Sequence, residues 1–387
     1  MIETKFKQTE IGLIPEDWEV KTLGEVCQNA LYGVGAEAIA YNGVDKYIRI
    51  TDIDDISGAY KPNPLASPSF YFDQHVVKEN DLLVARTGAS VGKSYLYNTT
   101  DGNLIFAGFL MKLNVCNANS QYVFYTTKTG RYMSWVASES ARTGQPGLNL
   151  EQLKCFQIPF PPLAEQVKIA KTLSDVDALI SDLDALIAKK RDIKQGTMQQ
   201  LLTGKKRLPG FTDEWKEKEI GEVVKIMKGQ SLQSKDFVNG TIPVVAGGQS
   251  YAGYHNTANH IETCITISAS GAYAGYIWLH NYPIFASDCS VMEGNDNVDV
   301  YFLYNVLKLN QDVIYKAQTG GAQPHIHPKD IAPLKVLCPS LSEQQAIATI
   351  LTDMDNEIQA LEAKRDKYTA IKQGMMQELL TGKIRLV

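Results

Sequence analysis

The sequence predicts an α+β fold in which two mixed α/β globular domains are separated by two long helices that form an antiparallel coiled coil. We expect the whole chain to be an internal repeat with pseudo-two-fold symmetry. Residues 163–208 recur without a gap as residues 341–386, and 25 of the 46 positions are identical. Both copies carry apolar residues that step by three and four, and Arg365 interrupts this stripe in the second copy. With 387 residues the chain is also long enough for two separate cores.

The repeat divides the chain into four segments. They are a first globular domain (residues 1–162), a central helix (163–208), a second globular domain (209–340) and a C-terminal helix (341–387). Each globular domain opens in a related way, because a Trp followed by Gly-Glu-Val begins both of them, at Trp18 and at Trp215. Each half of the chain is therefore one complete unit.

The first globular domain has the composition of short strands joined by turns. Residues 47–51 and 81–85 are β-rich, and Pro62–Pro64 and Gly102–Asn103 interrupt the pattern. Residues 120–137 are expected to form a helix.

The second domain follows the same plan, with predicted strands at 242–245 and 264–268 and a predicted helix at 300–309. Short landmarks recur in both domains, while the sequence between them differs. The pairs are Gly88-x-x-x-Gly92 with Gly271-x-x-x-Gly275, residues 105–107 with 284–286, and Thr143–Pro146 with Thr319–Pro324.

The two repeated segments are predicted to be helices that pack on each other. Their apolar residues step by three and four, which is typical of a coiled-coil seam. At 1.5 Å per residue, a helix of about 39 residues would be about 58 Å long, and the pseudo-two-fold makes the pair antiparallel. The predicted seam consists of Ile169, Leu173, Val176, Ile180, Leu183, Ile187, Ile347, Leu351, Met354, Ile358 and Leu361.

The seam leaves the outer faces of the helices unexplained. Lys-Gln-Gly is identical in the two copies although the globular domains have diverged. A second surface facing two copies of one partner would account for this identity, so Lys194, Gln195, Lys372 and Gln373 are predicted docking residues.

Composition indicates a folded protein outside the membrane. Charged residues make up 21% and hydrophobic residues 44%, and no apolar run reaches 18 residues. The opening residues are polar, so we expect a cytoplasmic protein. The six cysteines are scattered without a Cys-x-x-Cys pair, which favours buried thiols over a zinc site or a disulfide framework.

No catalytic motif is convincing. Gly88–Ser94 resembles a phosphate loop but has three residues between its glycines where four are needed, and its counterpart in the second domain lacks the Lys-Ser. Gly33-x-Gly35-x-x-Ala38 lies outside a βαβ context. The histidines lack the acidic or cysteine neighbours of a metal site. We predict no catalytic residue, no metal and no cofactor in this chain.

Polar and aromatic loop residues are the remaining candidates, and they suit the reading of DNA. Arginine forks match guanine edges, whereas Gln and Asn match adenine. Residues 209–340 contain no arginine, so that domain would have to use amides, hydroxyls, Lys, His or DNA shape. The candidates are Arg49, Arg86, Thr87, Ser90, Lys93, Arg142, Gln145, Lys228, Gln249, His255, Ser268, Ser270, Tyr273, Gln323 and His325.

Two diverged domains alternating with two near-identical helices resemble the specificity subunit of a type I restriction–modification system. Each helix is introduced by Pro-x-Leu-x-Glu-Gln (residues 161–166 and 339–344) and ends in Leu-Leu-Thr-Gly-Lys (residues 201–205 and 379–383). The resemblance covers essentially the whole chain.

The resemblance implies a non-catalytic, DNA-binding subunit. Its two target-recognition domains would each read one half of a split, asymmetric site in double-stranded DNA, and its helices would set the spacing between the half-sites. The helices would also dock two methyltransferase subunits, which bind S-adenosylmethionine. Restriction–translocase subunits that use ATP and Mg²⁺ would join this core of two methyltransferase subunits and one specificity subunit. The net charge of −5 fits, since such partners can supply phosphate contacts.

Two alternatives remain open on sequence grounds. One is a coiled-coil adaptor that reads no DNA sequence. The other is a nucleotide-binding enzyme that uses the Gly88–Ser94 loop.

Overall fold

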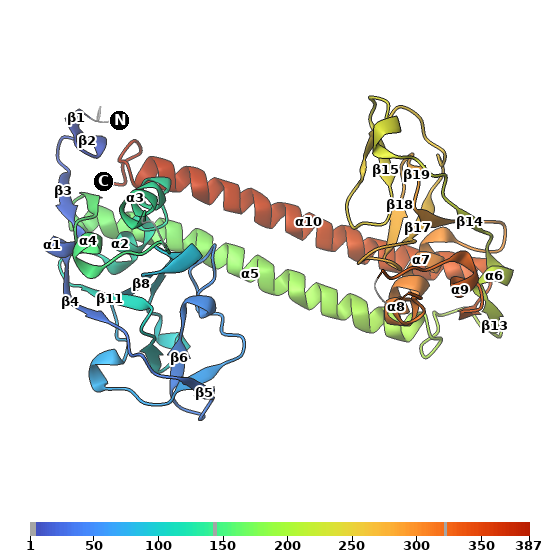
Figure 1. The fold of residues 1–387 in the computed structure, drawn as a ribbon, viewed down its shortest axis with the longest axis horizontal. Coiled ribbons are helices and arrows are strands. Elements are labelled where there is room, and N and C mark those ends of the chain that lie inside the picture. Colours follow the sequence, from blue (N-terminus) through green and yellow to red (C-terminus); the bar gives the residue numbers. More distant parts are fainter. Residues whose placement is uncertain (1–4, 142–144, 321–322) are drawn as a thin grey trace. The chain divides into compact units, whose positions relative to one another are not determined.

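The computed structural model describes residues 5–141, 145–320 and 323–387. It divides into two compact units: a first unit of Met1–Leu183 with Lys364–Val387, and a second unit of Asp184–Ala363. Two helices of 39 residues each, α5 (Leu163–Leu201) and α10 (Leu341–Leu379), contribute one part to each unit (Figure 1). The predicted α+β fold class is confirmed.

The globular part of the first unit is built from a four-stranded antiparallel sheet in the order β4-β11-β8-β9, with smaller two-stranded sheets around it. Its elements are β1 (Phe6–Thr9), β2 (Gly12–Pro15), β3 (Glu19–Thr22), α1 (Leu23–Val26), β4 (Cys27–Tyr32), β5 (Ala38–Ala40), β6 (Lys46–Ile48), β7 (Ala66–Pro68), β8 (Asp81–Ala85), β9 (Ser94–Leu96), β10 (Leu104–Phe106), β11 (Leu110–Val115), α2 (Ser120–Thr126), α3 (Gly130–Ser140), α4 (Leu150–Lys154) and β12 (Gln157–Phe160).

The second unit repeats this plan, with a four-stranded sheet in the order β14-β20-β17-β18. In both units a short parallel pair lies beside the main sheet, β10 with β6 in the first and β19 with β15 in the second. The elements are β13 (Lys216–Glu219), α6 (Ile220–Val223), β14 (Ile226–Lys228), β15 (Ile242–Val245), β16 (Gly253–His255), β17 (Cys264–Ser268), β18 (Ile277–His280), β19 (Phe285–Ala286), β20 (Cys289–Glu293), α7 (Val300–Leu309), α8 (Gln311–Lys316), α9 (Pro328–Ile331) and β21 (Lys335–Cys338).

The helix predicted over residues 120–137 is wrong in one respect, because it is two helices. The hydroxyls of Thr126 and Thr127 donate back to the carbonyls of Val123 and Phe124, which ends α2. The Thr129 hydroxyl then accepts from the backbone N–H of Tyr132 and caps α3.

Each core combines one globular domain with parts of both long helices. In the first unit the seam residues Ile169 and Leu173 of α5 belong to the same buried cluster as Met376 and Leu379 of α10 and Leu380 just after it. In the second unit the roles are exchanged. There Ile347 and Leu351 of α10 share a buried cluster with three residues of α5 and the segment after it, namely Met198, Leu201 and Leu202.

The predicted seam residues are all buried or half-buried. Besides the four just named, Leu183, Ile187 and Ile358 are buried, and Val176, Ile180, Met354 and Leu361 are half-buried.

A buried glutamate at the start of each long helix forms an ion pair with an arginine in the segment that follows the other long helix. We call this arrangement a latch. In the first unit Glu165, 3% exposed, accepts from Nε and Nη2 of Arg385 at 2.8 Å and from Nε1 of Trp18 at 3.0 Å. Burial opposes ionisation, but the hydrogen bonds from Arg385 and Trp18 hold the pKa of Glu165 below its ordinary 4.5. This latch therefore adds stability at neutral pH and loses it as the pH falls through the lowered pKa.

The second unit contains the equivalent latch. Glu343, fully buried, accepts from Nε and Nη2 of Arg207 at 2.8 and 2.7 Å and from Nε1 of Trp215 at 2.9 Å. The Glu of the Pro-x-Leu-x-Glu-Gln motif and the Arg that follows Leu-Leu-Thr-Gly-Lys are thus partners within this chain.

Candidate nucleic-acid interface and helix surfaces

The paired glycines in the loops that follow β8 and β17 have similar backbone conformations. Gly88 and Gly92 have φ values of +76° and +85°, and the values at Gly271 and Gly275 are +80° and +84°. Each of these angles lies in the left-handed region that glycine adopts without strain. In the first unit the N–H of Gly88 donates to the carbonyl of Pro146 at 3.0 Å, and in the second Gly271 donates to Pro324 at the same distance.

These contacts explain the Gly-x-x-x-Gly landmark that the two domains share. A Cβ on Gly92 would lie 2.8 Å from Cγ1 of Val136, so close packing also requires a glycine there. Backbone conformation and packing therefore account for Gly88-x-x-x-Gly92 without a bound phosphate. At Gly33, likewise, a Cβ would lie 2.1 Å from the carbonyl oxygen of Ala107.

Arg86, Thr87 and Ser90 lie on the loop after β8 and are half-buried, and Gln145 beside this loop is exposed. The guanidinium of Arg86 lies over the ring of Tyr32, 4.7 Å from its centroid. Sequence reasoning did not identify Tyr32 as part of this surface. Arg142 lies outside the described residues.

Two of the cations predicted to contact DNA from the first domain form ion pairs with aspartates of that same domain. Arg49 donates from Nε and Nη2 to the carboxylate of Asp52, both at 2.8 Å. Lys93 is 12% exposed, forms an ion pair with Asp55 at 2.5 Å and donates to the Ile53 carbonyl. Both side chains organise the segment around residues 49–55.

The candidates of the second domain divide into surface and interior residues. Lys228, Gln249, Tyr273 and Gln323 are exposed, whereas Ser270 and His325 are half-buried. His255 is 8% exposed, accepts from the backbone N–H of Val238 and packs edge-on against Phe285. Ser268 is also buried.

The titratable groups inside the second domain have ordinary structural partners. Burial lowers the pKa of His280 to about 4, and its Nε2 lies 2.9 Å from the Thr266 hydroxyl. Burial raises the pKa of the Cys264 and Cys289 thiols to about 12. Within residues 5–141, 145–320 and 323–387, no group of three or more His, Cys, Asp or Glu side chains is arranged to hold a metal ion.

In the repeated Lys-Gln-Gly segments, the lysines form ion pairs within the chain, whereas the glutamines are exposed. Lys194 bonds to both carboxylate oxygens of Asp355, at 2.5 and 2.6 Å, and Lys372 lies 2.5 Å from Asp177 in the equivalent pair of the first unit. In the second unit a later residue of α5 meets an earlier residue of α10, and in the first unit an earlier residue of α5 meets a later residue of α10, as antiparallel packing requires. By contrast, Gln195 and Gln373 are exposed.

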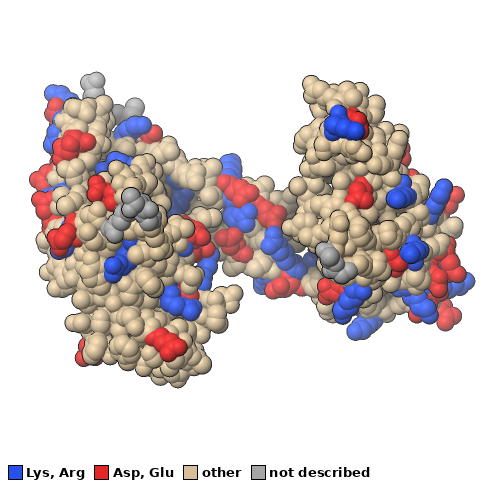
Figure 2. Space-filling view, viewed as in Figure 1, with Lys and Arg blue, Asp and Glu red and all other residues tan. Residues whose placement is uncertain are grey.

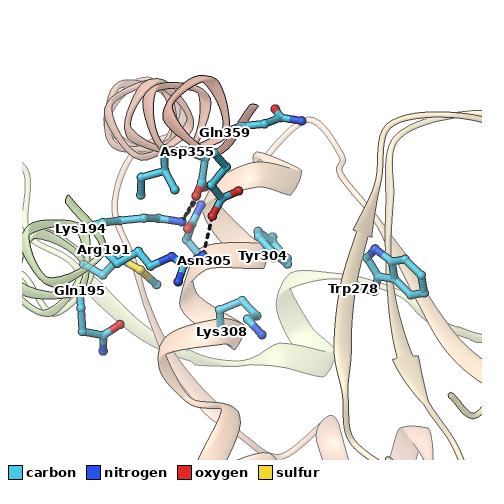
Figure 3. A pocket seen from close by; sticks show the side chains of 12 residues that line it. Arg191, Lys194, Gln195, Trp278, Tyr304, Asn305, Lys308, Asp355 and Gln359 are labelled. Carbon is cyan, nitrogen blue, oxygen red and sulfur yellow. Dashed lines mark hydrogen bonds and ion pairs between the residues drawn. The ribbon is translucent and has the colours of Figure 1, made fainter. Parts of the chain in front are cut away.

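A cleft of about 800 Å³ lies beside this segment in the second unit. Figure 3 shows Tyr304 and Lys308 of α7 on one side of it and Trp278 of β18 across from them. Asn305 of α7 is 2% exposed, and its Oδ1 has no hydrogen-bond partner in the described part of the chain. In the first unit, Tyr125 of α2 stands at the position that Asn305 has in α7. The hydroxyl of Tyr125 donates to Asp177 at 2.7 Å.

Charges of both signs are scattered over the face drawn in Figure 2. On the face drawn in Figure 2, Lys and Arg side chains lie among Asp and Glu, and no continuous basic patch covers either unit among the residues shown in colour. No helix in the described ranges has the length and apolarity that a bilayer span requires.

Comparison with known proteins identifies the family. The sequence model of the type I restriction modification DNA specificity domain matches twice, at residues 15–194 and 212–369. A Methanocaldococcus jannaschii protein assigned as the MjaX specificity subunit of a type I restriction enzyme is 27% identical, over 99% of this chain and 97% of its own length. The EcoprrI specificity subunit of Escherichia coli is 24% identical, over 72% of this chain and 71% of its own length.

Solved structures agree at the level of the fold. The crystal structure of a type I restriction–modification S subunit from M. genitalium superposes with a TM-score of 0.69 at 21% identity, covering 97% of this chain and 98% of that one. The family match extends over both globular domains and most of both long helices. The chain belongs to the specificity subunits of type I restriction–modification systems, the non-catalytic components that carry the DNA-recognition domains.

Proposed function

We propose that this subunit reads a split, asymmetric site in double-stranded DNA, with one target-recognition domain for each half-site. The observation that carries the proposal is the contrast between the two domains. They share one scaffold, with glycines of similar φ at corresponding positions, yet present different side chains on it. Two related scaffolds with different surfaces suit two different half-sites, and the 39-residue helices would set the number of base pairs between them.

The same helices would dock two methyltransferase subunits in the cytoplasm. These partners would bind S-adenosylmethionine and methylate adenine, and restriction–translocase subunits that use ATP and Mg²⁺ would join the resulting core. Gln195 and Gln373 are exposed and identical between the copies. Gly196 and Gly374 lie inside helices, and a Cβ at either position would have no neighbouring atom within 4 Å. Since glycine inside a helix costs about 0.5–1 kcal/mol relative to alanine, close approach by a partner is the reason we assign to it.

Replacing residues 209–340 with the corresponding domain of another specificity subunit tests the reading of DNA. We expect the methylated motif to change in one half-site and to keep the other, because each domain carries its own loops. Sequencing of methylated positions in a genome that contains the chimera and the methyltransferase gives the answer. Changes in both half-sites would contradict one domain per half-site.

Replacing Gly196 and Gly374 with alanine tests the docking. The isolated subunit is expected to become more stable by about 0.5–1 kcal/mol for each replacement. Its binding to the methyltransferase is expected to weaken at least about tenfold, because the new methyl groups enter a close contact. Calorimetric titration measures the affinity, with Ser181→Ala at an exposed position of α5 as the matched control. Unchanged affinity in the double variant would place docking elsewhere.

A further inference from the structure

Arg86 differs from several other arginines of the first unit in the hydrogen bonding of its Nε within the described residues. Its Nε is buried and has no hydrogen-bond partner in the parts of the chain that the structure describes. Other arginines of the first unit are paired, since Arg49 donates to Asp52, Arg131 to the Gln157 carbonyl and Arg385 to Glu165. A buried donor left unpaired costs about 1–3 kcal/mol. This cost indicates that the side chain is held in place for a partner outside the chain.

The position of Arg86 is fixed at both its backbone and its side chain. Its N–H donates to the carbonyl of Phe109 at 3.0 Å, and its carbonyl accepts from Leu148 at 2.8 Å. The guanidinium lies on the ring of Tyr32, whose own hydroxyl accepts from the backbone N–H of Leu150 at 3.1 Å. The plane of the guanidinium is therefore set by a ring that is itself anchored.

We propose that Arg86 reads a guanine in the half-site of the first domain, with its N–H groups donating to O6 and N7 and with Tyr32 as its platform. A planar fork in a fixed orientation suits these two acceptors, whereas a phosphate contact needs charge and tolerates a mobile side chain. The inference rests on the proposed function, because it presupposes that this domain contacts DNA bases.

The second domain provides an internal comparison. Alignment of the two glycine loops places Ala269 where the first domain has Arg86, and residues 209–340 contain no arginine. A guanine contact of this type is thus a property of the first half-site alone.

The test is the methylated motif of the complete complex. The subunit is produced with its methyltransferase in cells without other adenine methylation, and the modified positions are sequenced. The first half-site is the one that survives replacement of residues 209–340. Arg86→Gln and Arg86→Lys are expected to reduce the preference for guanine at one position of this half-site by roughly tenfold to a hundredfold. The other positions and the second half-site keep their preferences.

Variants of Tyr32 test whether its ring supports the guanidinium of Arg86 during base recognition. Tyr32→Ala is expected to relax the same position, whereas Tyr32→Phe, which keeps the ring, preserves the preference for guanine. Thermal melting and co-purification with the methyltransferase establish that each variant is folded. Uniformly weaker methylation of an unchanged motif would make Arg86 a phosphate contact and overturn the proposal, as would full activity of both Arg86 variants. A wild-type motif that is not bipartite would instead contradict the proposed function.

Discussion

Replacing Glu343 with alanine is expected to lower the free energy of unfolding of the second unit by about 3–5 kcal/mol, the usual cost of removing one partner from a buried charge pair. The carboxylate is fully buried and accepts three hydrogen bonds, two from Arg207 and one from Trp215. Its removal leaves a cation and an indole N–H without an acceptor. Urea unfolding followed by circular dichroism measures the loss.

A matched control separates the buried latch from ion pairing between the helices in general. Glu357 and Lys190 also join α10 to α5, at 2.6 Å, but their side chains are 49% and 30% exposed. Glu357→Ala should therefore cost no more than about 1 kcal/mol. Equal losses in the two variants would show that burial of Glu343 contributes nothing of its own.

A chain that ends at Leu208 is expected to form a homodimer. The first unit is completed by the end of α10 and its tail, which contribute Met376, Leu379, Leu380 and Arg385. In the truncated chain the same residue types are present as Met198, Leu201, Leu202 and Arg207. A second copy can therefore supply each contact, including Lys194 in place of Lys372 opposite Asp177.

Light scattering coupled to size-exclusion chromatography gives the mass of the truncated chain. The matched variant Arg207→Glu places a carboxylate against Glu165 and Asp17, the two groups that Arg385 contacts, and should shift the truncated chain towards monomer. A folded monomer at micromolar concentration without that substitution would contradict the interchangeability of the two tails.

Sequence alone predicted those parts of the fold whose signal is local. The strands at 81–85, 242–245 and 264–268 and the helix at 300–309 are confirmed with the bounds that the pattern gave. The break between α2 and α3 was missed because it depends on threonine hydroxyls bonding to backbone groups, which apolar periodicity does not report.

The latches and the ion pairs between the helices could not be predicted from local patterns, since their partners are 128 to 220 residues apart in the chain. One signal was available. Each copy of the repeat begins with a glutamate and ends with an arginine, and antiparallel packing brings opposite ends together. Identity of the lysines between copies thus has a reason inside the chain, so the exposed glutamines and glycines support docking more strongly than Lys194 and Lys372 do.

The candidate DNA contacts show where residue type misleads. Arg49 and Lys93 are cations, which made them candidates for DNA contacts. In the structure Arg49 forms an ion pair with Asp52, and Lys93 forms one with Asp55. His255 is polar in sequence and buried in the structure. Arg86 remains because its buried Nε has no hydrogen-bond partner among the described residues, and that fact depends on the fold.

The discontinuity of the first unit has a consequence for protein synthesis. A ribosome makes the chain from its N-terminus, so the continuous second unit, residues 184–363, is complete before the last 24 residues of the first unit emerge. Until then Glu165 and Trp18 lack Arg385, and the first core lacks Met376, Leu379 and Leu380. Within a single chain, the first core can therefore be completed only after residues 364–387 have been made.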